Sequence, residues 1–356
     1  MMKKLISKEI PLIFLILALV VIKILGVYFA TDIFSKYSPL IDSNLYLTNF
    51  YKNEGIIRTL VVQKLAILIS DFGSYFFTHF VFGIISAVGF IYYYLRGGKS
   101  CLILLFLLLP SSLVWTSIVG KDALFFGGFG WILFIWSKFT IDPLDIFDIF
   151  SLILGFSICL LMRPHYAFVL IWLFFSTALL KVFSERAFPA ILIAFILFGL
   201  GIYFFAWEQL LARGYGGIDS LARASRFEFF RIIPHGEIGF ERFRELVPLG
   251  IITGIIGPLP SELIARPVFI PFFLEGLLIL ISPFALMWVL SGNLFANKTT
   301  FIRIFWWSLV PSIFLAMVIH APFGLLNPGS AIRWRTDFEQ IFYLAPFLLF
   351  LQMRDD

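Results

Sequence analysis

The feature that most constrains this chain is a series of apolar runs that recur along all 356 residues. Many of these runs reach the about 20 residues that a helix needs to cross a hydrocarbon core of about 30 Å. Backbone polar groups in lipid must be satisfied within the segment, so such runs fold as helices. With 60% hydrophobic and 14% charged residues, the chain is predicted to be an all-α polytopic membrane protein with one transmembrane domain, 1–356.

The apolar runs predict ten membrane spans, and the basic N-terminus leads into an apolar core too long for a typical signal peptide, so an uncleaved first helix is expected. The two cysteines, Cys101 and Cys159, lie inside apolar runs, so no disulfide framework is predicted. The ten predicted spans are 10–30, 74–95, 101–118, 123–139, 149–162, 166–182, 188–207, 268–290, 304–322 and 338–352.

Short basic loops fix the predicted orientation. The stretches "RGGK", "SK", "SERA" and "NKTTFIR" fall on the same side as the basic N-terminus. The positive-inside rule then places both termini in the cytoplasm of a multi-pass protein of the inner (plasma) membrane. Two long segments face the other side: a first outer loop over 31–73, with a stretch at 60–70 that is either an interfacial helix or a span, and an Arg-rich outer loop over 208–267.

Arginines concentrate on this predicted outer face. Arg163 ends an apolar helix just before a proline, and Arg333 and Arg335 stand at the predicted start of the last helix. Helix N-termini favour acids, so two arginines there need an explanation. A bound phosphate would supply one, because backbone N–H groups and guanidinium forks both bind anions. Ser330 is then a candidate N-cap, and one arginine of the pair can face Asp337 or Glu339 instead of the ligand.

Two aspartates in the first outer loop are candidate catalytic bases. Asp32 lies just past the first span, and Asp42 opens the stretch "DSNLY". A carboxylate at the membrane surface can take the proton from an attacking sugar hydroxyl. The alternative is ordinary helix capping by Asp42 and Ser43.

A second group of charges is the pair Lys121 and Asp122, in a very short connection after the apolar segment that Pro110 interrupts. A broken helix at membrane depth is tolerated where it lines a cavity. Lys121 is a candidate phosphate ligand, and Asp122 a candidate partner of Lys121, of an arginine or of a substrate hydroxyl. A charged turn that caps the next helix is the alternative.

Four further residues are candidates for supporting roles. Glu262 follows Pro-Ser at a predicted helix start, where an acid is expected, and Glu275 lies inside an apolar span, where it needs a partner. His165 and His320 lie on the predicted outer side near span ends. A structural role is the alternative for each histidine.

Nucleotide-binding and zinc motifs are absent from the sequence. The candidate groups lie on the outer face, where no nucleotide sugar is expected, so energy for a transfer has to come with a lipid-linked phosphate ester. The expected partners are the lipid bilayer, a polyprenyl-linked glycan donor and a glycan acceptor, with no nucleic acid.

Five short motifs, "DSNLY", "PSSLVWTSIVGKD", "LMRPH", "GPLPSE…FFLE" and "NPGSAIRWR", together resemble membrane proteins of bacterial polysaccharide clusters. They are similar to GT-C glycosyltransferases and to O-antigen or exopolysaccharide repeat-unit polymerases. The resemblance implies a polyprenyl-phosphate- or diphosphate-linked sugar donor used on the periplasmic or extracellular side. It implies that Asp42, or else Asp32, is the base in the first outer loop, and that Asp122 is a further acid.

The resemblance also bears on the metal and on the arginines. The chain lacks the paired-acid signature that many GT-C members carry in the first loop, so a divalent cation (Mg²⁺ or Mn²⁺) stays open as cofactor. Polymerases of this group use outer-loop arginines, which agrees with phosphate binding by Arg163, Arg333 and Arg335. Two rivals remain: a flippase or transporter of a lipid-linked glycan, and a glycan ligase with His165 or His320 as base.

Overall fold

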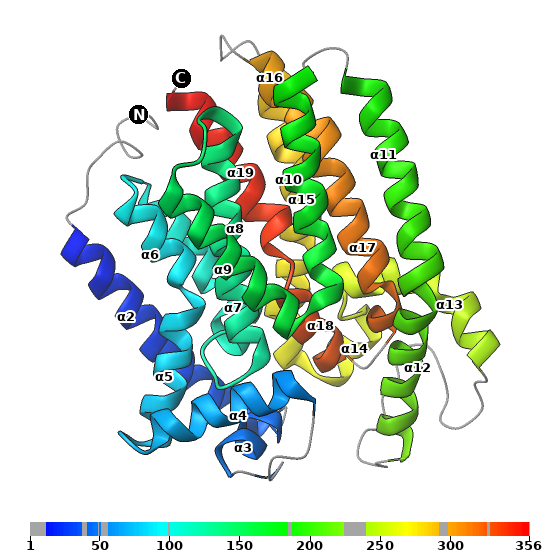
Figure 1. Cartoon of the computed structure of the whole chain (residues 1–356). Helices are drawn as coiled ribbons and strands as arrows, with labels where there is room; N and C mark the ends of the chain where they lie inside the picture. The colour runs from blue at the N-terminus through cyan, green and yellow to red at the C-terminus, as the bar shows by residue number, and fades with distance from the viewer. Residues whose placement is uncertain are drawn as a thin grey trace. The chain divides into compact units, whose positions relative to one another are not determined.

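The computed structural model describes residues 12–37, 41–48, 50, 56–98, 100–183, 187–223, 240–291, 298–325 and 328–355. Every regular element in these ranges is helical, as predicted. The chain divides into two compact units: unit 1 comprises Met1–Ala167 and Thr336–Leu348, and unit 2 comprises Phe168–Arg335 and Leu349–Asp356. Figure 1 shows the helices along the chain with their labels.

Unit 1 contains the N-terminal helices and the start of the last helix. Its long helices are α2, α4, α5, α8 and α9, and the segment before α8 is broken into short pieces. The bounds are α2 Leu12–Tyr28, η1 Phe29–Ile33, η2 Phe34–Lys36, α3 Ile41–Leu47, α4 Ile57–Ser70, α5 Tyr75–Ser86, α6 Val88–Leu95, η3 Cys101–Leu108, α7 Pro110–Trp115, α8 Lys121–Ile141 and α9 Ile146–Met162.

Unit 2 contains most of the remaining helices. Three of these elements run from one unit into the other: α10 begins in unit 1, α18 ends on Thr336 of unit 1, and the first residues of α19 belong to unit 1. The bounds are α10 Pro164–Phe183, α11 Ala187–Ile202, η5 Tyr203–Trp207, α12 Glu208–Arg223, α13 Phe240–Ile255, α14 Pro260–Ala265, η6 Pro267–Phe269, α15 Ile270–Ser291, α16 Lys298–Ile304, η7 Phe305–Leu309, α17 Val310–Gly324, α18 Pro328–Thr336 and α19 Gln340–Asp355.

Among the described residues, six helical segments are long and apolar enough to cross a membrane, and a seventh results if the bent pair α5 and α6 counts as one span. These lengths and compositions indicate a multi-pass membrane protein. Seven of the ten predicted spans coincide with these segments, whereas 149–162 corresponds to the shorter apolar helix α9. The six segments are Leu12–Lys36, Lys121–Ile141, Pro164–Phe183, Phe188–Gly216, Pro267–Trp288 and Thr299–Gly324.

Two predicted spans and one predicted loop differ from the structure. Residues 101–118 form the 3₁₀ segment η3 and the short α7, because Pro110 has no N–H to continue a helix and instead begins α7. The last helix, α19, has 16 residues and ends on charged ones, so it is too short to count as a span. Within 208–267, the described residues form the helices α12, α13 and α14 and the start of η6.

Helix α8 packs against α5, α6 and α9 within unit 1 (Figure 1). Glycines make this close approach possible, as small residues do in membrane helices. A Cβ at Gly128 would lie 3.3 Å from the Gly155 carbonyl oxygen of α9, and a Cβ at Gly127 would collide with the Ile85 carbonyl oxygen of α5. These contacts hold α8 close to α5 and α9 around Gly127 and Gly128, while its charged residues Lys121, Asp122 and Lys138 lie nearer its two ends.

Candidate functional site

The start of α8 carries a buried ion-pair centre. Arg163, the C-cap residue of α9, pairs with Asp122 through Nη2, and its Nε lies 2.9 Å from Oδ2 of Asp337. All three side chains are buried. A guanidinium between two carboxylates balances part of their charge where water cannot, and removing one partner of such a pair is costly.

Lys121, the first residue of α8, is half-buried and belongs to the same group. Its Nζ lies 5.9 Å from the ring centroid of Tyr46 in α3, within cation–π range. The charged groups that act on it are Arg163, Arg58, Asp122 and Asp42. We call the six residues Asp42, Arg58, Lys121, Asp122, Arg163 and Asp337 the ionic cluster.

The ionic cluster sits on a backbone that is braced from two sides. Ser43 Oγ donates to the Val119 carbonyl at 2.7 Å, and the Val119 N–H donates to His79 Nδ1 at 2.9 Å. The N–H and the carbonyl of buried Val119, in the turn before α8, therefore both have hydrogen-bond partners. This bracing fixes the positions of Lys121 and Asp122 relative to α3 and α5.

The two candidate bases differ in their surroundings. Asp42 lies in the first turn of α3, is half-buried and belongs to the ionic cluster. Asp32 lies in η1, is exposed, and has the Thr31 hydroxyl as its hydrogen-bond partner among the described residues, at 2.7 Å. The structure therefore brings Asp42, and not Asp32, to the charges at the start of α8.

The prediction that Arg333 and Arg335 occupy the first turn of the last helix is wrong. Both lie in the last turn of the separate short helix α18, and α19 begins only at Gln340. The C-terminal end of a helix is the partially negative end, so arginines are favourable there without a bound anion. Ser330 lies inside α18 and is not its N-cap.

Arg335 is fully buried in unit 2 and engaged by protein atoms. Its Nη1 donates to the carbonyls of Ile255 and Gly257 at 2.8 and 3.0 Å. Its Nη2 donates to the Phe272 carbonyl at 3.1 Å and to Oε2 of Glu275 at 3.3 Å. Glu275, 1% exposed, thus has the partner that its position in an apolar helix requires.

The other candidates lie at structural positions. Glu262 is in the first turn of α14, where its Oε2 accepts the Leu259 N–H at 2.6 Å, as expected for an acid at a helix start. His165 is buried, with its ring centroid 4.3 Å from that of Tyr166. His320 is buried in α17, so close to Gly254 that a Cβ there would lie 2.6 Å from its Cδ2. Arg333 is half-buried.

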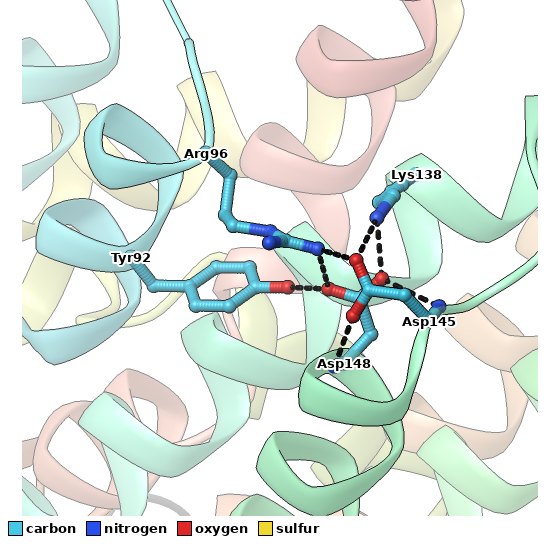
Figure 2. A network of polar contacts seen from close by, with 5 residues as sticks. All are labelled: Tyr92, Arg96, Lys138, Asp145 and Asp148. Atoms are coloured by element: carbon cyan, nitrogen blue, oxygen red, sulfur yellow. Dashed lines mark hydrogen bonds and ion pairs between the residues drawn. The ribbon is translucent and has the colours of Figure 1, made fainter.

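The far end of α8 carries a second polar network, which the sequence did not predict (Figure 2). We call it the α8–α9 clamp, defined by the side chains of Tyr92, Arg96, Lys138, Asp145 and Asp148. Asp148 accepts from Tyr92 and Lys138, and from Arg96 at 2.8 Å; Arg96 and Lys138 also pair with Asp145. Asp145 and Asp148 form a reciprocal capping box at the start of α9.

The charges in the α8–α9 clamp support one another. The backbone N–H of Asp148 and the guanidinium of Arg96 hold the pKa of Asp145 well below its usual range. The hydrogen bond to Asp145 raises the pKa of Arg96. A 21-residue α8 is about 31 Å long at 1.5 Å per residue, so the clamp and the ionic cluster lie near opposite ends of this helix.

The described residues contain no group of three or more His, Cys, Asp or Glu side chains placed to hold a metal ion. Comparison with protein-family models, curated protein sequences and solved structures found no match for this chain.

Proposed function

We propose that the chain is a membrane glycosyltransferase that uses a polyprenyl-phosphate- or diphosphate-linked sugar or repeat unit, with its chemistry at the ionic cluster. The observation that carries this proposal is the position of Asp42 beside the start of α8, where its neighbour Ser43 donates to the Val119 carbonyl and where Asp42 acts on the charge of Lys121. A carboxylate that accepts a proton and a cation that receives the leaving phosphate are the two groups that such a transfer requires.

In the proposed reaction, the oxygen of the acceptor hydroxyl forms a bond to the carbon of the donor sugar, and Asp42 takes the proton of that hydroxyl. The bond from that carbon to the lipid phosphate breaks, and Lys121 and Arg58 balance the charge on the leaving phosphate. Tyr46 is nearly fully buried against Lys121, so we assign it to holding the ammonium and not to stacking on a sugar.

The ion pairs in the structure reduce the number of arginines that we propose as phosphate ligands. Arg163 already pairs with Asp122 and Asp337, so we propose that it positions the start of α8 and that Asp122 is part of this support. Arg335 is occupied by carbonyls and Glu275 in unit 2, so it is left out of the proposed phosphate site. Arg333 also lies in unit 2, so the phosphate ligands that we propose within the ionic cluster are Lys121 and Arg58.

A flippase or transporter is the second candidate, and one observation favours it. Ionisable side chains are buried inside both units, including Lys23 in unit 1 and Glu275 in unit 2. Transporters place such residues along their ion and substrate pathways. An assay that follows both transfer and lipid movement separates the two candidates.

The test uses the full chain in lipid nanodiscs with a polyprenyl-diphosphate-linked glycan and a free glycan acceptor, and mass spectrometry identifies the products. We expect transfer by the wild type, loss of transfer in Asp42→Asn and Lys121→Met, and retained transfer in Asp32→Asn, the matched exposed control. Movement of a fluorescent lipid-linked glycan from one leaflet of a vesicle membrane to the other, without any transfer of the glycan to the acceptor, would instead support the flippase. Equal transfer by Asp42→Asn and wild type would remove Asp42 from the mechanism.

A further inference from the structure

Lys23 occupies an unusual place near the middle of the candidate span Leu12–Lys36. Its side chain is fully buried, and a Cβ at Gly83 of α5 would lie 3.4 Å from its Cβ and Cδ. Its Nζ donates to Thr116 Oγ1 at 2.7 Å, which is the only hydrogen bond of this ammonium within the described ranges. A charge buried at this depth is costly and is a candidate for function.

Glu339 is buried in the same unit and is held by hydroxyl groups. Its Oε2 accepts from Ser111 Oγ at 2.9 Å, and its Oε1 accepts from Ser112 Oγ at 2.8 Å. The Tyr343 hydroxyl lies 3.5 Å from Oε1. Each of these hydroxyls can donate a proton as well as accept one.

Ser112 and Thr116 connect the two ionisable groups. They lie four residues apart, on α7 and at its C-cap, and therefore on one face of a helical turn. Thr116 Oγ1 donates to the Ser112 carbonyl, while Ser112 Oγ donates to Glu339. One turn of hydroxyl groups thus separates the Lys23 amine from the Glu339 carboxylate.

We propose that Lys23, Thr116, Ser112 and Glu339 form an intramembrane proton-transfer pair, in which one proton moves between Lys23 Nζ and Glu339 Oε1. An N–H bond breaks at Lys23 and an O–H bond forms at Glu339, while each hydroxyl takes one proton and releases one. The pair passes from ammonium and carboxylate to amine and carboxylic acid, without any change in net charge. Thr116 Oγ1 donates to the Ser112 carbonyl in the structure, so the transfer also requires the Thr116 side chain to move until its hydroxyl can donate to Ser112 Oγ.

The elements packed against α2 hold few other titratable groups among the described residues. His79 on α5 accepts the Val119 N–H through Nδ1, and Asp32 on η1 bonds to Thr31. Cys101 lies at the start of η3. The proposal concerns the interior of unit 1 and does not rest on the proposed glycosyl transfer.

The first test is a double-mutant cycle on thermal unfolding of the full chain in nanodiscs. We expect Lys23→Met and Glu339→Gln each to lower the unfolding temperature, and the double variant to recover much of the loss, because no unpaired charge remains. In a Thr116→Val background, the effects of Lys23→Met and Glu339→Gln on the unfolding temperature should become additive, so that the coupling between the two residues is lost. Ser117→Ala, which removes a buried hydroxyl without a described hydrogen bond, is the matched control and should leave the coupling intact.

The second test is infrared spectroscopy of the carboxylic acid C=O stretch. We expect an acid band that Glu339→Gln removes and that Lys23→Met strengthens, because the carboxyl group then keeps the proton. Ser112→Ala, a milder change, should shift the same band if Lys23→Met does not fold. Additive single variants together with an absent acid band would overturn the proposal and leave Lys23 and Glu339 as two independent buried groups.

Discussion

Arg163 is the residue that joins two buried carboxylates of the ionic cluster. Its two carboxylate partners come from the start of α8 and from the segment just before α19, and all three side chains are buried. Arginine suits this place because its planar fork offers several donors in fixed directions. The proposed reacting groups, Asp42 and Lys121, therefore depend on an ion pair that the substrate need not touch.

The first prediction concerns this ion pair. Arg163→Met should lower the free energy of unfolding by about 3–5 kcal/mol, because it leaves two buried carboxylates without their cation. The measurement is chemical or thermal unfolding in detergent micelles. Arg163→Met combined with Asp122→Asn and Asp337→Asn should recover part of the loss, and an Arg163→Met variant as stable as the wild type would contradict the assignment.

The second prediction contrasts the two aspartates of the α8–α9 clamp. Asp145 is 46% exposed, so Asp145→Asn, which keeps a capping side chain, should change the stability only slightly. Asp148 is fully buried, so Asp148→Asn should cost about 3–5 kcal/mol by leaving Lys138 and Arg96 short of a partner. Unfolding measurements on the two single variants check this order, and a reversed order would contradict it.

The pH dependence of Asp145 has a definite sign. Its pKa is lowered in the folded protein, so its contribution to stability is fully present above the ordinary aspartate pKa of about 3.9 and is lost only at lower pH. The difference between the wild type and Asp145→Asn should therefore stay constant through the neutral range.

At the scale of elements, hydropathy predicted where long helices lie but not where short ones begin. The apolar runs at 123–139 and 166–182 correspond to α8 and α10. The boundary between α18 and α19 was missed because "RWRTDFEQ" carries no glycine or proline to end a helix. The Arg335 contacts with distant backbone carbonyls are tertiary, so no local pattern could show them.

The third prediction concerns the crossing of α13 and α17 in unit 2. A Cβ at Gly250 would collide with the Ala321 carbonyl oxygen, whereas a Cβ at Gly199 has nothing within 4 Å. Gly250→Ala should therefore destabilise the protein by about 1–3 kcal/mol through overpacking. Gly199→Ala, the matched control in a helix interior, should stabilise it by about 0.5–1 kcal/mol. The measurement compares the unfolding temperatures of the two variants with that of the wild type. Equal shifts would contradict the close packing of α13 against α17.

The fourth prediction concerns the whole molecule in its membrane, where we propose that the ionic cluster faces outward. Asp71 follows α4 and Asp142 follows α8, and both are exposed in unit 1. With Cys101 replaced by Ser, an impermeant maleimide should label Asp71→Cys in intact cells and Asp142→Cys only after permeabilisation. The opposite pattern would reverse the orientation and place the ionic cluster in the cytoplasm.

The sequence predicted the membrane class and several charged residues of the site, because apolar length and charges beside apolar runs are local features. It did not predict which charges pair. Asp337, Glu339 and Lys23 have their partners far along the chain, and such pairing follows from helix packing. Asp42 and Asp32 look alike in sequence, and only the fold separates them.

The most direct test of the central claim is the rate of lipid phosphate release from a polyprenyl-diphosphate-linked glycan, measured with acceptor present for Asp42→Asn and Asp32→Asn at equal amounts of folded protein. The proposal predicts that Asp32→Asn releases lipid phosphate at a rate close to that of the wild type. It predicts a loss of at least about 100-fold for Asp42→Asn, the lower range for removal of a general base. Equal rates for the two variants would contradict the claim that the ionic cluster is the reacting centre.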